Sequence, residues 1–145
     1  MGTELKDLAG KHILDAVDMT VEQFEEYDGE FRDANVCIFR LNGTAYAAVE
    51  DESDGYRSSM RSLVVRPKAR MKNRFPAITV VGIHRNKNEY HQDDILELVD
   101  VESGKTVLTV GTRNSDDYYP SFVASFQPEN MSTNARTARA EGGAE

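Results

Sequence analysis

Apolar and polar residues alternate over several short runs of this chain, and a period of two is typical of strands with one buried face. The clearest pattern is a hairpin from Asn35 to Asp51, in which two alternating runs flank Asn42-Gly43. This dipeptide favours the positive φ angles of a type I′ turn. A second hairpin is predicted from Ile95 to Gly111, around a turn at 102–105.

Further alternating runs predict single strands. They cover the segments 11–17, 62–66, 77–84 and 121–126. The first of them places Ile13 and Val17 on one face, and the last ends before Pro128. Together with the two hairpins, these runs give six to eight short strands.

A short helix is predicted between Thr20 and Gly29. Thr20 and Gln23 match a capping box, and apolar side chains then recur at helical spacing. The fold class that follows is mainly β: a small antiparallel barrel or sandwich of six to eight strands with one short helix.

The length of 145 residues fits a single domain. After Asn130 the chain becomes rich in Ser, Thr, Ala, Arg and Gly without apolar periodicity, so we expect a β-rich domain over 1–130 and a disordered tail over 131–145. No apolar run approaches the roughly 20 residues that span a bilayer, and the N-terminus lacks a secretory pattern. These features predict a cytoplasmic protein without membrane contact.

Basic residues are concentrated in one stretch of an acidic chain. The net charge is −8, yet nine Lys or Arg and no Asp or Glu occur from Arg57 to Lys87. So many positive charges in one stretch repel one another unless negative charges lie nearby. Either acidic residues of the same or another subunit pair with it, around a solvated loop at Arg66 to Arg74, or an anion binds there. A compact anion fits better than long nucleic acid, which the acidic remainder of the chain would repel.

One motif occurs twice, each time after a predicted hairpin. Gly43, Val49, Ser53, Asp54 and Tyr56 match Gly104, Val110, Ser115, Asp116 and Tyr118 when one residue of slack is allowed. Asp and Ser after a strand commonly hydrogen-bond to nearby backbone, which explains them without any ligand. Tyr and Arg in the same loops indicate a ligand-binding site, because the flat ring of Tyr can stack on a base and the rigid donor fork of Arg can bind its phosphate.

A site formed by the two loops would use the Tyr, Arg, Ser, Thr and Asp side chains that they carry. Its predicted ligand-binding residues are Asp54, Tyr56, Arg57, Ser58, Arg61, Thr112, Arg113, Tyr118 and Tyr119. Tyr56 would stack on the base with Tyr118 or Tyr119, while Arg57 and Arg113 would bind phosphate. Asp54, Ser58 and Thr112 would fix the orientation. A chain this short makes shallow pockets, so we expect a homo-oligomer in which another copy completes the site.

Other chemistry finds little support in the residues. The acidic run 50–54 contains only a fragment of a calcium loop, and paired acids lack a defined base for hydrolysis. His12, His84 and His91 have no metal-ligand spacing, and Cys37 sits mid-strand as a small buried side chain. No phosphate loop, dinucleotide fingerprint or serine elbow is present. We therefore predict no catalytic residue, metal or cofactor.

The two loops also carry a resemblance. The sequences Glu-Asp-Glu-Ser-Asp-Gly-Tyr-Arg-Ser at 50–58 and Val-Gly-Thr-Arg-Asn-Ser-Asp-Asp-Tyr-Tyr-Pro at 110–120 resemble loops of small proteins from tailed bacteriophages, over Leu8 to Met131. This resemblance implies a context in which small proteins counter host defence, some by sequestering a nucleotide messenger and others by binding a defence protein.

Three functions follow as expectations. The first is non-catalytic binding and sequestration of a small anionic, nucleotide-like signalling molecule in the host bacterial cytoplasm. The second is a protein inhibitor that imitates DNA with acidic faces at Glu22 to Glu30 and Asp93 to Glu102. The third is hydrolysis of such a nucleotide.

Overall fold

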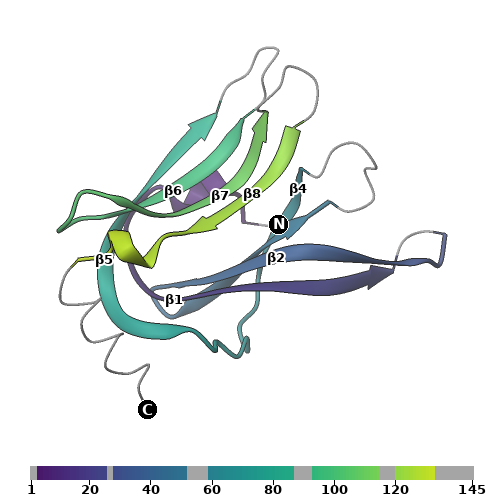
Figure 1. Ribbon diagram of the computed structural model, residues 1–145, viewed down its shortest axis with the longest axis horizontal. Helices are drawn as coiled ribbons and strands as arrows, with labels where there is room; N and C mark the ends of the chain where they lie inside the picture. Colours follow the sequence, from purple (N-terminus) through teal and green to yellow (C-terminus); the bar gives the residue numbers. More distant parts are fainter. Residues whose placement is uncertain (1–2, 26–27, 52–58, 87–92, 115–119, 133–145) are drawn as a thin grey trace.

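The protein is described here by a computed structural model, which covers residues 3–25, 28–51, 59–86, 93–114 and 120–132. Eight antiparallel strands form one sheet, in the order β4-β3-β2-β1-β5-β6-β7-β8 (Figure 1). The elements are η1 (Leu5–Leu8), β1 (Gly10–Glu25), β2 (Phe31–Leu41), β3 (Thr44–Glu50), β4 (Met60–Val65), β5 (Arg74–Asn86), β6 (Asp94–Asp100), β7 (Thr106–Asn114), β8 (Pro120–Phe126) and η2 (Pro128–Asn130). The predicted mainly β class is confirmed.

The sheet curls so that its two edge strands, β4 and β8, approach each other. Within the described ranges no strand ladder joins these two edges, so the sheet that they form is not a closed barrel. The main core lies on the inner face and includes Phe39, Leu96 and Leu108, which are fully buried. Leu5 and Leu8 of η1 pack into the same core, and the carbonyl of Leu8 lies so close to Gly82 that only glycine fits there.

A second apolar layer covers the outer face of β1, β2 and β3. It is formed by the segment from Arg66 to Asn73, which we call the strap because it joins β4 to β5 across this face. Met71 of the strap is buried there. The strands present mostly small side chains beneath it, which allow close approach: Ala16, Ala34, Ala45 and Ala47. β1, β2 and β3 therefore bury side chains on both faces beneath the strap.

The predicted helix between Thr20 and Gly29 is wrong. Residues up to Glu25 continue β1, which pairs with β2 from Ala16↔Arg40 to Glu25↔Phe31. The local capping pattern is overridden by this pairing, and Val21 and Phe24 suit a strand well. The helical elements of the described chain are the short turns η1 and η2, and neither is long and apolar enough to cross a membrane.

A β-bulge at Asp15 changes which side chains of β1 face the core. Pairing with β2 shifts between Leu14 and Ala16, so Leu14 and Val17 both point to the main core. Ile13 therefore lies on the other face and is 43% exposed. The predicted grouping of Ile13 with Val17 is wrong because an inserted residue reverses the alternation.

Both predicted hairpins are confirmed, as β2–β3 and β6–β7. Asn42 and Gly43 have φ angles of 54° and 81°, as a type I′ turn requires.

Met131 and Ser132 are buried, and the backbone N–H of Ser132 donates to the buried carboxylate of Asp100. The packed part of the chain therefore extends two residues past the predicted boundary at 130, and 133–145 lie outside the described residues.

Candidate functional site

The curl of the sheet brings together the strand ends from which the two repeated loops depart. Met60 is the first residue of β4, directly after the first loop, and its backbone N–H donates to Oγ1 of Thr112 across 2.9 Å. Thr112 lies near the end of β7, directly before the second loop. In a flat sheet these residues would lie in opposite halves. We call this junction of β4 with β7 the mouth.

Polar side chains, together with the ring of Phe122, lie on the inner face on both sides of the mouth. On one side, Asp94, Thr112 and Phe122 are register partners on β6, β7 and β8, so their side chains share one face. On the other side, Glu50 lies opposite Asn35, and its Oε1 accepts hydrogen bonds from the backbone N–H and side-chain amide of Asn35, at 3.0 and 3.1 Å. Glu50 Oε2 has no partner within the described residues.

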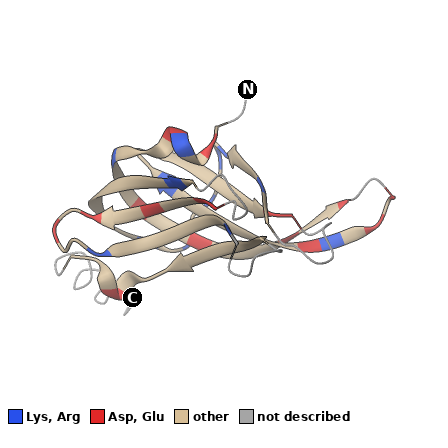
Figure 2. Ribbon diagram, turned by 90° about the horizontal axis from the view of Figure 1, so that it is seen from above, with Lys and Arg blue, Asp and Glu red and all other residues tan. Residues whose placement is uncertain are grey.

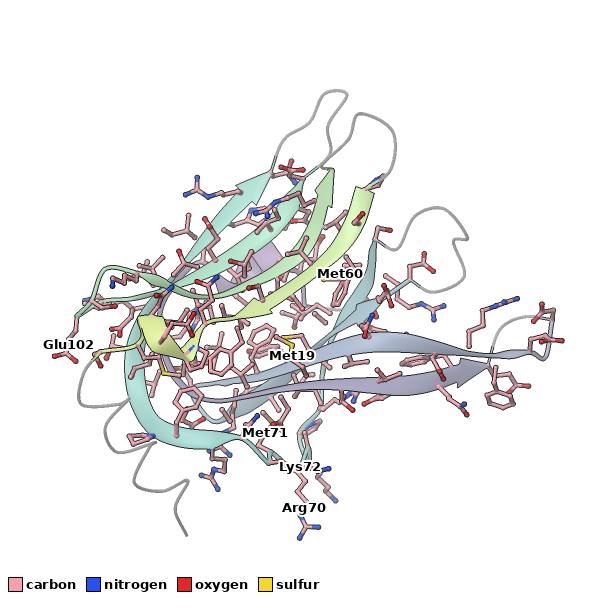
Figure 3. The ribbon with its side chains drawn as sticks, in the orientation of Figure 1. Met19, Met60, Arg70, Met71, Lys72 and Glu102 are labelled. Atoms are coloured by element: carbon pink, nitrogen blue, oxygen red, sulfur yellow. The ribbon has the colours of Figure 1, made fainter. Side chains whose placement is uncertain are left out.

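A cavity of about 250 Å³ lies between these two sides. Met19 and Phe122 supply apolar walls, and Figure 3 shows Met19 between β1 and β8. The full lining is Met19, Thr20, Asn35, Val36, Glu50, Phe122 and Ala124. An aromatic face beside a carboxylate and an amide can hold a flat, donor-bearing ring.

Most of the predicted site residues lie outside the described residues, namely Asp54, Tyr56, Arg57, Ser58, Tyr118 and Tyr119. Thr112 lies at the mouth, where its hydroxyl oxygen accepts the Met60 N–H. Arg61 follows Met60 on the opposite face of β4, with its guanidinium 5.8 Å from the centre of the Phe24 ring. Arg113 is exposed on the opposite face from Thr112. The structure therefore places Thr112 at the mouth, and Arg61 and Arg113 on the opposite face of their strands.

Several bases of the predicted basic stretch form intramolecular ion pairs. Arg66 binds both oxygens of Glu22, at 2.6 and 2.8 Å, and this contact holds the pKa of Glu22 below its usual value and raises that of Arg66. Arg85 pairs with Glu97 on the neighbouring strand. Acidic partners within the chain thus compensate part of the stretch.

The strap borders a second cavity, of about 410 Å³, on the far side of β1. Arg70 and Lys72 lie at its edge, and Figure 3 shows both beyond β1, away from β8. Asp18 belongs to β1, and its carboxylate accepts hydrogen bonds from the backbone N–H groups of Lys72 and Asn73, at 2.8 Å each. This carboxylate fixes the end of the strap.

Two further reactive side chains are held in place by the fold. Cys37 is fully buried, and burial together with the charge of Asp18 raises the pKa of its thiol to about 12, so it stays protonated as predicted for a core residue. His84 Nε2 lies 2.6 Å from Oδ1 of Asp94, the register partner of Thr112. Among the described residues no group of three His, Cys, Asp or Glu is placed to hold a metal ion.

The cavity residues Met19, Asn35, Phe122 and Ala124 were missed by sequence reasoning. Glu50 was noted only as part of an acidic run. Nothing local marks these residues, since each occupies an ordinary inward position on its strand and the cavity forms only when β8 closes over β1 and β2. Comparison of the chain with protein-family models, curated proteins and solved structures gives no match.

Proposed function

We propose that this protein is a non-catalytic binding protein that captures a small anionic, nucleotide-like signalling molecule at the mouth. The observation that carries the proposal is the hydrogen bond between Met60 and Thr112, because it joins the attachment points of both repeated loops beside one cavity. The resemblance of these loops to phage proteins supports a role against host defence in the bacterial cytoplasm.

The cavity suits the uncharged part of such a ligand. Its 250 Å³ is below the roughly 300–1,000 Å³ of pockets that bury a whole drug-sized molecule, so it fits a base or a sugar and not a complete nucleotide. Phe122 offers a stacking face, and Oε2 of Glu50, which has no partner among the described residues, can accept from ring N–H groups or ribose hydroxyls.

The phosphate then lies outside the cavity, at the mouth. Arg57 and Tyr56 belong to the connection that ends just before Met60, whereas Arg113 is exposed on the opposite face of β7. An arginine fork is the usual partner of phosphate oxygens. Because the cavity is open on one side and small, we expect a second copy to cover the ligand in a homo-oligomer.

The hydrogen bonds of the polar side chains at the mouth support binding of the ligand without its conversion. Glu50 is hydrogen-bonded to Asn35, His84 to Asp94, and Thr112 to a backbone N–H. Within the described residues these contacts stabilise the mouth and do not pair a nucleophile with a base.

Calorimetry against a panel of linear and cyclic nucleotides tests the proposal. We expect one or more to bind, and Glu50→Gln to weaken binding by about tenfold, since it replaces a charged acceptor by a neutral one. Arg57→Ala should weaken binding of the nucleotide and leave that of the parent nucleoside unchanged.

Glu102→Gln serves as the matched control, because this exposed carboxylate lies in the β6–β7 turn, well away from Met60 (Figure 3). Its binding should equal that of the unmodified protein. Absence of heat with every nucleotide, or equal affinity in Glu50→Gln and Glu102→Gln, would remove the proposal.

A further inference from the structure

One half of β1 has an unpaired backbone edge. β5 pairs with β1 only from Gly10 to Ala16, and the last contact on that side is the N–H of Val17, which donates to the carbonyl of Asn73. Because N–H direction alternates along a strand, the N–H groups of Met19, Val21 and Gln23 point the same way. They have no hydrogen-bond partner within the described residues.

This edge belongs to a two-stranded arm that extends from the body of the protein (Figures 1 and 2). The arm comprises residues 18–25 with residues 28–35. On the face shared with Val21, the register places Glu25, Phe31 and Asp33, and Val21 and Phe31 are 58% and 62% exposed. Large apolar side chains this exposed, beside an open strand edge, are typical of a docking surface.

The arm is also strongly acidic. It carries six acidic residues and one base, a net charge of −5. Glu22 is paired with Arg66, Asp28 with Arg32, and Asp18 with the strap. Glu25, Glu30 and Asp33 have no ion-pair partner in the described part of the chain. A partner must therefore supply positive charge, and a second copy of the arm would bring only more negative charge.

We propose that the arm is the docking site for an extended, basic segment of a partner protein, which adds as a strand to the free edge of β1 at residues 19–25. Main-chain hydrogen bonds to Met19, Val21 and Gln23 hold the segment. Its apolar side chains cover Val21 and Phe31, and its Lys or Arg side chains pair with Glu25 and Asp33. This edge adjoins the cavity at Met19, whose side chain lines the cavity.

The test uses a ten-residue peptide in which every second residue is threonine and the residues between them alternate between lysine and valine, so that both kinds of side chain lie on one face of the added strand. Its binding to the full-length protein is followed by fluorescence anisotropy. We expect binding that weakens steeply with salt, and a peptide with glutamate in place of lysine should not bind. Methylation of alternate backbone nitrogens, which removes the donors along one edge of the peptide, should weaken binding by about tenfold. This last variant does not depend on how a mutant protein folds.

On the protein, Val21→Pro removes one outward N–H and should weaken peptide binding by about tenfold, since proline is tolerated at strand edges but donates nothing. Val65→Pro is the matched control. Its N–H also points away from the sheet, because the next residue, Arg66, donates to Ala45, and it lies on the edge strand β4.

Equal binding of the methylated and unmethylated peptides, or an equal loss of peptide affinity in both proline variants, overturns the proposal. A dimer of the protein alone that Val21→Pro dissociates also overturns it, because a second copy then occupies the edge.

Discussion

The backbone N–H of Met60 donates to Oγ1 of Thr112 at 2.9 Å, although the two residues are 52 positions apart in the chain. Met60 begins the edge strand β4 and Thr112 lies on β7, beside the other edge strand. In the part of the chain that the structure describes the edges of the sheet form no ladder, so this side-chain acceptor takes the place of a strand partner at the mouth. The junction joins the start of β4 to β7 beside the cavity.

Thr112→Val should weaken the junction. Valine has nearly the same shape but accepts no hydrogen bond, so the half-buried N–H of Met60 loses its partner and the free energy of unfolding falls by about 1 kcal/mol. Urea unfolding measures this change, and Thr112→Ser is the control that keeps an acceptor. In native-state hydrogen exchange the Met60 amide should lose protection in the valine variant only. Unchanged protection there would show that the bond does not hold the junction.

The hairpins could be predicted because their turns depend on the residues in the turn itself. The predictions that failed concern segments whose structure depends on pairing with distant strands. Asn42 and Gly43 adopt the turn that their own conformational preferences favour. The segment after Thr20 has helical spacing, but pairing with β2 makes it a strand. The bulge at Asp15 is likewise invisible in a simple alternation, because it reflects how β1 matches both of its neighbours.

The ion pair between Glu22 and Arg66 should make the protein sensitive to acid. Hydrogen bonding to Arg66 lowers the pKa of Glu22 in the folded state below 4.5, so the unfolded state takes up its proton first. The stabilisation is therefore complete above the unfolded pKa and is lost as the pH falls through the folded pKa. Glu22→Gln should cost about 1 kcal/mol near neutral pH and give a shallower loss of stability below about pH 4.5.

Denaturant unfolding at a series of pH values measures both effects. Glu30→Gln is the control, since Glu30 has no ion-pair partner within the described residues. It should follow the unmodified protein at every pH. If Glu22→Gln did the same, the ion pair would contribute nothing, and the strap would be held by its apolar contacts, by Asp18 and by its backbone hydrogen bonds to Val17 and Ala45.

Cys37 should not react with thiol reagents in the folded protein. Its side chain is fully buried and its thiol has a pKa of about 12, so almost no thiolate exists near pH 8. A colorimetric disulfide reagent should label it only after denaturant is added. Lys11→Cys in a Cys37→Ala background places a thiol on an exposed residue of β1 and should react at once. Rapid labelling of native Cys37 would contradict the burial of the inner face.

Gly82 should tolerate no side chain, because a Cβ there would overlap the carbonyl oxygen of Leu8 in η1. We expect Gly82→Ala to displace η1 from the core and to lower the free energy of unfolding by about 2–3 kcal/mol. Gly104→Ala provides the comparison: its φ of 71° is strained for alanine, but the space is open, so about 1 kcal/mol is expected. Equal losses in urea unfolding would mean that η1 moves aside freely.

The candidate site was less predictable than the fold. Of the predicted site residues that the structure describes, Thr112 lies at the mouth, whereas Arg61 lies on the other face of β4 beside Phe24. A one-residue step along a strand reverses the face, so a list of neighbouring residues cannot separate the two. Glu50 and Asn35 meet only because β2 and β3 pair in register, and Phe122 reaches them only through the curl of the sheet.

The most direct test of ligand capture is mass spectrometry of the small molecules that the purified protein releases on heating. We predict an unaltered nucleotide from the unmodified protein and from Ser125→Leu, which changes an exposed residue of β8. Ala124→Leu fills the cavity wall from the neighbouring position and should release none. Recovery of no nucleotide from the unmodified protein, of nucleotide fragments, or of equal amounts from Ala124→Leu would contradict capture at the mouth.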